Sequence, residues 1–261
     1  MSDPEPFITI DGDYASGLLL LADHARNELP EGYGTLGLPK SEFRRHIAYD
    51  IGVEQVTRLI ARQLDVPAVM CGFSRLLVDP NRGEDDPTLI RQLYDGAIIS
   101  GNYPLPDRER ELRLERWYRP YHRAVAIAVE KVADRCGMPP LIIAIHSFTP
   151  HMQGFDRPWH ASLLWDTDDR AMRLLYDALT KDSGLNIGDN EPYDGALKGD
   201  TMYQHATVNG YPHVLIEIRQ DLIAHQDGQA QWAGILANAL DDINRRPDIH
   251  QQQKFGSRTH A

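Results

Sequence analysis

Apolar residues recur along the chain in two patterns. Short, nearly continuous apolar runs predict buried strands at residues 17–22, 68–71, 76–78, 141–145, 162–165 and 214–218. Longer segments with apolar residues three or four positions apart predict helices at residues 41–64, 107–135, 168–181 and 227–244. Pro120 is expected to kink or split the second helix. Strands that alternate with helices are typical of a mostly parallel sheet, so the sequence predicts an α/β protein.

Nothing in the sequence divides the chain into two halves. We find no repeat at a fixed period and no Gly/Ser-rich or Pro-rich linker, so residues 1–246 are expected to form a single domain. The polar residues 247–261 lack an apolar stripe and are expected to be a flexible tail. Residues 79–106 and 184–211 show no clear periodicity, and loops of this length are commonly functional.

Composition excludes several classes of partner. The 261 residues carry a formal net charge of −11, which disfavours binding to nucleic acids or anionic membranes and favours a small-molecule partner. The longest apolar runs are far shorter than the roughly 20 residues of a membrane helix, and the N-terminus lacks a leader pattern. Two cysteines, Cys71 and Cys136, indicate reduced thiols rather than a disulfide framework. We therefore expect a cytoplasmic protein.

Polar residues stand at or near the ends of four predicted strands, where a structural strand does not need them. They are Asp23, His24, Asp79, Asn81, Arg82, His146, Glu217, Arg219 and Asp221. Ligands of open α/β sheets bind beyond the carboxyl ends of the strands, so residues far apart in sequence can meet there. The sequence therefore predicts a site assembled from distant segments.

His24 and His146 are candidate ligands of a catalytic zinc ion, which commonly takes three protein ligands. Each could instead be a structural histidine bonded to a loop carbonyl. Asp50 lies near the apolar stripe of the predicted helix 41–64, where a carboxylate needs a cation. A salt bridge to Arg44, Arg45 or another buried cation is the alternative.

Two further residues suggest chemistry. Glu217 lies on the strand face opposite Ile216 and Ile218, where it can act as a general base or pair with Arg219. Arg82 beside Asn81 suits a clamp for a substrate carboxylate, although it could also stabilise its loop.

Other motifs are weak. The glycines of GYGTLG at residues 32–37 lie too far beyond the end of the predicted strand 17–22 to form a dinucleotide site. The motif GFSRL around Ser74 lacks the second glycine of a nucleophile elbow.

Six separated motifs together resemble the N-formylglutamate amidohydrolase family, over about residues 18–240. In order they are DHARNELP, RHIAYDIG, SRLLVDPNR, AIHSFTP, GDNEPY and PHVLIEIRQDL. More distantly, D-x-N-R at residues 79–82, I-H-S at 145–147 and E-x-R at 217–219 are similar to the zinc carboxypeptidases. The resemblance implies a three-layer α/β/α domain with a mostly parallel mixed sheet, as in the carboxypeptidase and phosphorylase/hydrolase-like folds.

The resemblance also implies roles for individual residues. His24 and His146 become zinc ligands, and Glu217 becomes the general base. The carboxypeptidase motif H-x-x-E has Asn27 in place of its Glu here, so Asp50 is the preferred third ligand and Glu28 the runner-up.

The implied activity is zinc-dependent hydrolysis of a linear amide, with one zinc ion per chain. The substrate is a small acidic N-acyl amino acid such as N-formylglutamate, which releases formate and the amino acid. Its two carboxylates call for two cationic clamps: Asn81 with Arg82 forms one, and Arg219 or Arg75 the other. The alternatives are a carboxypeptidase-like enzyme or another N-acyl amino acid deacylase, and a non-catalytic ligand-binding relative. The sequence carries no signal for an oligomeric state.

Overall fold

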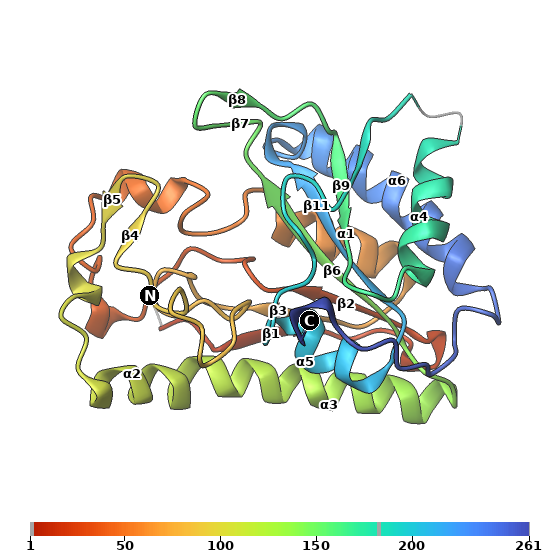
Figure 1. Ribbon diagram of the computed structural model, residues 1–261, viewed down its shortest axis with the longest axis horizontal. Helices are drawn as coiled ribbons and strands as arrows, with labels where there is room; N and C mark the ends of the chain where they lie inside the picture. The colour runs from red at the N-terminus through yellow and green to blue at the C-terminus, as the bar shows by residue number, and fades with distance from the viewer. Residues whose placement is uncertain (1–2, 182–183, 261) are drawn as a thin grey trace.

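A seven-stranded mixed sheet forms the centre of the computed structural model, which describes residues 3–181 and 184–260 (Figure 1). Its strands, in spatial order, are β1 (Phe7–Ile10), β3 (Ala68–Cys71), β2 (Leu18–Ala22), β6 (Leu141–Phe148), β11 (His213–Arg219), β9 (Ala161–Leu164) and β10 (Ile187–Asp189). Strands β3, β2, β6 and β11 pair in parallel, whereas β1 pairs antiparallel with β3, and β9 antiparallel with β11. The predicted α/β class with a mostly parallel mixed sheet is confirmed.

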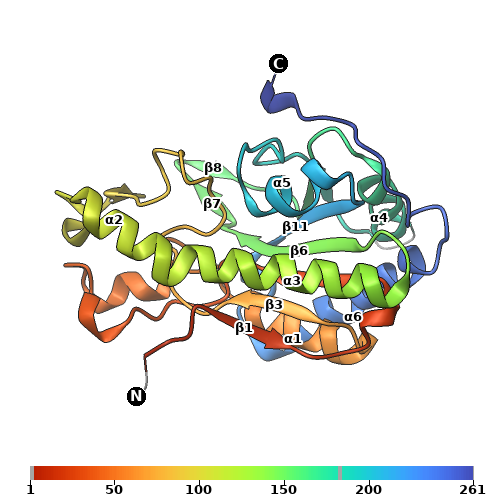
Figure 2. The ribbon, with the colours of Figure 1, turned by 90° about the horizontal axis from the view of Figure 1, so that it is seen from below.

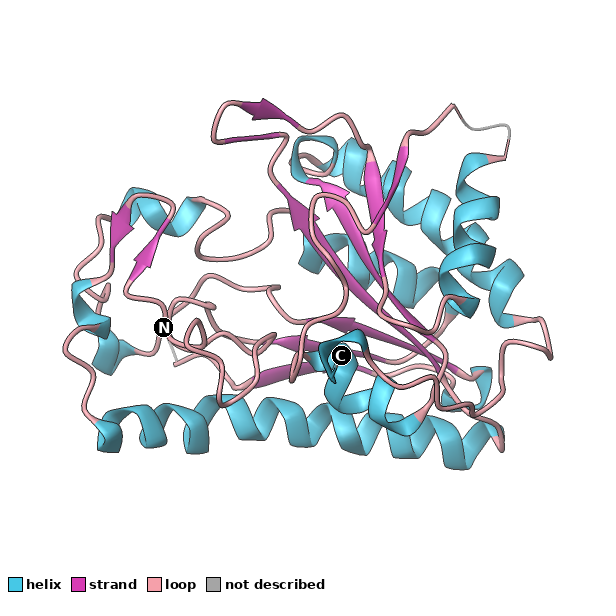
Figure 3. Cartoon of the chain, in the orientation of Figure 1, coloured by secondary structure: helices cyan, strands magenta, loops and turns pink. Residues whose placement is uncertain are grey.

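Helices cover both faces of this sheet, which gives three layers (Figures 2 and 3). One face packs against α1 (Val53–Leu64), α4 (Arg170–Thr180) and α6 (Gln226–Asn244). The other packs against α3 (Arg119–Cys136), with α2 (Asp107–Arg113) preceding it and α5 (Thr201–His205) nearby. Because both faces are covered, central strands read as continuous apolar runs: in β2, Leu18 and Leu20 face the first layer and Leu19 and Leu21 the second.

The predicted helix 41–64 is wrong in its first half. Residues Lys40–Arg44 form a 3₁₀ turn after Pro39, and the α-helix begins only at Val53. Gly52 explains the boundary, because its φ of +83° is left-handed and a Cβ there would lie 2.2 Å from the carbonyl oxygen of Ile223. Asp50 therefore lies in the loop before α1, where its amide donates to the carbonyl of His24 over 2.9 Å.

The expected break at Pro120 is confirmed. A π-helical turn at Leu114–Tyr118 separates α2 from α3, and Pro120 lies in the first turn of α3. Proline has no amide hydrogen to donate to the preceding turn, and π turns are a common way to accommodate such a defect.

The predicted strand at residues 76–78 is wrong. These residues form a turn that leaves the sheet after β3, and the prediction failed because burial alone makes them apolar. The strand prediction at 141–145 was too short, since β6 continues through His146 to Phe148.

Two short hairpins extend beyond the main sheet (Figure 1). Strands β4 (Leu93–Tyr94) and β5 (Ala97–Ile98) form one, and β7 (His151–Met152) and β8 (Phe155–Asp156) the other. The first lies within the stretch 79–106 that the sequence left without periodicity. Residues of both hairpins contribute to the site described below.

The single-domain boundary and the flexible tail at 247–261 stay predictions. In the described part of this segment, His250 is buried, and its ring nitrogens lie 3.0 Å from the carbonyl oxygen of Pro139 and 2.7 Å from that of Asn244. Arg258 donates to the carbonyl of Trp165 over 2.8 Å and forms an ion pair with Asp194 at 2.5 Å.

Candidate metal centre and active site

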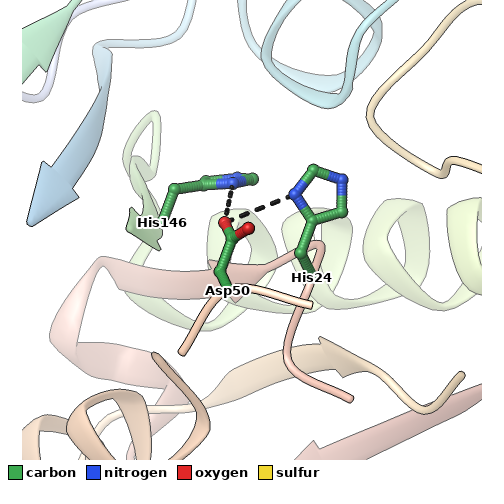
Figure 4. Close-up of side chains that lie close together, drawn as sticks. All are labelled: His24, Asp50 and His146. Atoms are coloured by element: carbon green, nitrogen blue, oxygen red, sulfur yellow. Dashed lines mark hydrogen bonds and ion pairs between the residues drawn. The ribbon is translucent and has the colours of Figure 1, made fainter. Parts of the chain in front are cut away.

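Three buried side chains from separate segments converge near the carboxyl ends of β2 and β6 (Figure 4). His24 follows β2, Asp50 precedes α1 and His146 lies in β6. The Nδ1 atoms of the two histidines lie 3.3 Å and 2.9 Å from the same atom, Asp50 Oδ2. Each side chain offers a ligand atom within 4.8 Å of the other two, and such a group could hold a metal ion.

Two more buried carboxylates orient the histidine rings from behind. His24 Nε2 lies 2.7 Å from Asp79 Oδ1, and His146 Nε2 lies 2.8 Å from Asp23 Oδ2. A carboxylate only accepts hydrogen bonds, so each imidazole donates from Nε2 and, when neutral, presents a lone pair at Nδ1. This carboxylate–histidine arrangement is the usual support for a metal-binding imidazole.

The donor set fits a divalent cation. Two Nδ1 lone pairs and the carboxylate of Asp50 face one another, and none of these groups supplies a proton when the histidines are neutral. With neutral histidines, the three buried carboxylates of Asp23, Asp50 and Asp79 outnumber the one guanidinium paired with them, that of Arg75, and leave an excess of negative charge among these buried groups. Two nitrogen ligands and one oxygen ligand suit zinc better than magnesium or calcium.

The carboxylates are held in their charged form. Burial opposes ionisation of Asp23, but the hydrogen bonds with His146 and Thr201 and the attraction of His146 and His24 together outweigh burial and lower the pKa of Asp23 to about 2. Burial likewise opposes ionisation of Asp50 and Asp79, whose pKa values are lowered by His24 and Arg75, respectively. In the metal-free protein, hydrogen bonds with Asp23 and Asp50 overcome burial and raise the pKa of His146.

Further contacts fix these outer carboxylates. Tyr121 and Thr201 donate their hydroxyls to Asp23 Oδ1 over 2.7 Å and 2.6 Å. Arg75 donates to Asp79 Oδ2 over 2.7 Å and reaches Asp50 Oδ1 at 3.5 Å. The two histidines are thereby tied to helix α3, to α5 and to the turn after β3.

Glu217 lies beside this centre on the neighbouring strand. In the parallel pair β11–β6 it stands opposite His146, and it faces the same cavity. Its Oε2 atom is buried and has no hydrogen-bond partner within residues 3–181 and 184–260. Burial raises the pKa of Glu217 to about 7, although the attraction of His146 opposes this.

A cavity of about 430 Å³ opens onto these groups, a size that suits a small organic molecule. The two long stretches without periodicity both line it, the first with Asn81 and Arg82 and the second with Tyr193 and Asp200. Asn81 Oδ1 accepts from the amide of Thr201 over 3.1 Å. Arg82 donates from Nη1 to the carbonyl of Asn81 over 2.6 Å and from Nε to Thr88 Oγ1 over 3.2 Å.

Comparison with known protein families gives a match to N-formylglutamate amidohydrolase over residues 16–224. The matched segment contains all three converging side chains and Glu217. The chain belongs to the N-formylglutamate amidohydrolase family. This confirms the resemblance that the six motifs indicated.

Individual relatives extend the comparison. The chain is 25% identical over 214 residues to an N-formylglutamate deformylase of Pseudomonas putida, a match that spans 76% of this chain but 66% of that relative. The structure of the gene product Atu2144 from Agrobacterium tumefaciens is similar with a TM-score of 0.84 and 31% identity, over 92% of this chain and 97% of that one. An N-formylglutamate amidohydrolase from Ralstonia eutropha shares the fold, with a TM-score of 0.66 and 22% identity over the same shares.

The structure separates the candidate third ligands of this family member. Glu28 is exposed and pairs with Arg26 at 3.4 Å, and the amide of Asn27 donates to the carbonyl of Phe43 over 2.6 Å. Asp50 is the candidate that lies with the two histidines. Asp50 forms no salt bridge with Arg44 or Arg45, and Arg45 pairs with Glu42. The other form of this alternative, a salt bridge to another buried cation, is present beside the histidines, because Arg75 reaches Asp50 Oδ1 at 3.5 Å.

Arg219 does not reach the cavity. It pairs with Asp221 over 2.8 Å, and its side chain is 19% exposed. The alternative reading of Glu217 as its ion-pair partner is therefore wrong in this structure. Arg75 does line the cavity, but Asp79 and Asp50 already take up its charge.

Sequence reasoning missed several polar residues of the site. Asp23 and Asp79 stood out as polar strand-end residues, yet nothing in the sequence assigned them to the histidine rings. Arg91, Tyr94 and Tyr193 also line the cavity. These three lie in segments without periodicity, where the sequence does not indicate which way a polar or aromatic side chain points.

None of the helices in the described residues is both long and apolar enough to cross a membrane.

Proposed function

We propose that the protein is a zinc-dependent amidohydrolase that cleaves the amide of an N-formyl amino acid such as N-formylglutamate. The observation that carries the proposal is the convergence of His24, His146 and Asp50 at a cavity that also contains the unpartnered carboxylate of Glu217. Family membership supports the reaction class, and the name of the Pseudomonas putida relative supports the formyl group.

We infer one zinc ion per chain, held by His24 Nδ1, His146 Nδ1 and Asp50 Oδ2. When bound, such an ion supplies a Lewis acid that polarises a carbonyl and acidifies water. Asp23 and Asp79 keep the two imidazoles in the tautomer that presents Nδ1.

Glu217 moves the proton in this proposal. Its carboxylate accepts a proton from the water that attacks the formyl carbon, and it later donates that proton to the amine nitrogen as the C–N bond breaks. A carboxyl with a pKa of about 7 is matched to both tasks near neutral pH.

Asn81 and Arg82 are proposed to hold the α-carboxylate of the substrate. Arg82 lines the cavity and has no carboxylate within 4.0 Å among the described residues, so its charge is available to a ligand.

The predictions of a cytoplasmic location and of no nucleic-acid partner rest on the net charge of −11 and on the free Cys71 and Cys136.

A substrate panel tests the proposal. Zinc-loaded protein is incubated with N-formyl-, N-acetyl- and N-succinyl-L-glutamate, and free amine and formate are measured. Faster release from the N-formyl compound, abolished by a chelator and by Glu217→Gln, supports the proposal. If the protein prefers another acyl group, it is a different deacylase. If none of the compounds releases amine, the enzymatic assignment is overturned.

A further inference from the structure

Three guanidinium groups from one segment of the chain line the cavity. Arg75, Arg82 and Arg91 come from the segment between β3 and β4, and they influence one another electrostatically. Arg75 is neutralised by Asp79 and Asp50. Among the described residues, neither Arg82 nor Arg91 has a carboxylate within 4.0 Å.

Arg91 is the least satisfied of the three. Across residues 3–181 and 184–260 its side chain makes no hydrogen bond, has no carboxylate within 4.0 Å, and keeps its Nε atom buried without a partner. Burying a charged donor without an acceptor is costly. Burial lowers the pKa of Arg91, and the nearby Arg82 and Arg75 add to this effect. An anion is the ligand that would satisfy it.

Tyr94 fixes the position of this guanidinium. The Arg91 guanidinium carbon lies 4.5 Å from the centroid of the Tyr94 ring, and that of Arg75 lies 5.5 Å from the same centroid. Arg91 and Arg75 are therefore no further apart than the sum of these distances. Arg75 also reaches Asp50 Oδ1 at 3.5 Å, so it links the pair Tyr94 and Arg91 to the proposed metal ligands.

The other arginines near the site are already engaged. Arg157 donates to Thr149 Oγ1 over 3.1 Å and to the hydroxyl of Tyr193 over 3.0 Å. Arg219 pairs with Asp221 outside the cavity lining. Neither offers a free face to a ligand.

We propose that Arg91, held against Tyr94, binds the side-chain carboxylate of the substrate and selects N-formyl amino acids that carry a second negative charge. The inference rests on the proposed function. Arg82 and Asn81 hold the α-carboxylate, so the two anionic groups of a dicarboxylic substrate meet two separate guanidinium groups. Arg91 thus takes the place for which the sequence offered Arg219 or Arg75.

A substrate pair of nearly equal shape tests the role of Arg91. N-formyl-L-glutamate has a side-chain carboxylate where N-formyl-L-glutamine has an amide, and the two are otherwise the same. The ratio of their kcat/KM values therefore measures the effect of the side-chain charge. Arg91→Gln should lower this ratio about 10- to 100-fold, the range expected for one charged hydrogen bond. Arg91→Lys keeps a point charge and should retain part of the preference.

Two control variants make the ratio specific. Arg135→Gln removes an exposed charge near the end of α3, far from the cavity lining, and should leave the ratio unchanged. Arg82→Gln should lower kcat/KM for both substrates to a similar extent, because both carry the α-carboxylate. Melting curves identify any variant that is unfolded.

The outcomes separate the inference from the proposed function. If the wild-type protein hydrolyses both compounds but folded Arg91→Gln leaves the ratio at its wild-type value, Arg91 is not the anchor while the deformylase assignment stands. If the wild-type protein hydrolyses neither compound, the proposed function fails and the inference falls with it. A wild-type protein that favours the glutamine compound also overturns the inference.

Discussion

Glu217 on β11 stands directly opposite His146 on β6, and its Oε2 atom is buried with no hydrogen-bond partner in the part of the chain that the structure describes. The two strands are parallel and fully paired here, so backbone geometry fixes the carboxylate beside the histidine. An unsatisfied buried carboxyl group destabilises a fold unless it serves another purpose. This relationship is the strongest structural support for catalysis.

Glu217→Gln should lower kcat by about 10² to 10⁴, the range typical of a general base, while zinc content stays unchanged. The amide has nearly the same shape but cannot accept the water proton. Because Oε2 has no partner to lose, the melting temperature should not fall. A metal-loaded variant with near-normal kcat would exclude Glu217 as the base.

Asp50→Asn should weaken zinc binding because it removes an anionic ligand. The loss should exceed the roughly 10- to 100-fold that is typical when a residue hydrogen-bonded to a metal ligand is changed. Glu28→Gln is the matched control, since Glu28 is exposed and pairs with Arg26. Zinc affinity is measured by competition with a chelator. Loss of zinc in Glu28→Gln, with normal affinity in Asp50→Asn, would contradict this ligand set.

Asp23→Asn should lower zinc affinity about 10- to 100-fold although no proposed ligand is removed. The charge of Asp23 holds the proton on His146 Nε2, and the amide supports that tautomer less well. Asp227→Asn, an exposed change in the first turn of α6, should leave zinc affinity unaltered. Equal affinities in the two variants would remove Asp23 from the support of the site.

Asp200 should make the stability of the metal-free protein depend on pH. Burial raises the pKa of Asp200 from 3.8 to about 7; Asp23 adds to the effect, whereas the amide of Tyr203, Arg82 and His146 oppose it. The folded state then binds more protons than the unfolded state between these values, so the contribution of Asp200 to stability is greatest below pH 3.8 and is lost as pH rises to 7.

Asp200→Asn tests this dependence and keeps the N-cap, because Asn caps helices as well as Asp. Between pH 5 and 8, the free energy of unfolding of the variant minus that of the wild type should rise by about 2 to 3 kcal/mol. Denaturant titrations of both metal-free proteins measure the difference. A difference that is constant across this range would mean that Asp200 ionises normally.

The sequence predicted those parts of the fold in which an apolar run is a strand buried in the sheet. Residues of β3 and β11 were found because strands covered on both faces are apolar throughout. The turn at residues 76–78 is equally apolar for a different reason, since Leu76 packs in a cluster of loop residues and Leu77 and Val78 belong to the cluster that contains helix α3. Local composition cannot separate these two causes.

The candidate site was predicted where residues lie in or just after strands, as His24, His146 and Glu217 do, and only in part where they lie in loops. Asp50 was selected because it was placed near the apolar stripe of a helix, whereas the structure holds it in a loop through the carbonyl of His24. Its selection agrees with the observed cluster although that reasoning was wrong. Arg91 carried no signal, because only the folded chain places it against Tyr94 without an acceptor.

The most direct test of the central claim is a zinc titration of the metal-free protein with N-formyl-L-glutamate as substrate, in which the initial rate of formate release is measured at each step. The account predicts no release without metal and a linear rise that stops at one zinc ion per chain. Formate release at full rate from protein shown to be free of metal would contradict it, as would no release at any amount of zinc.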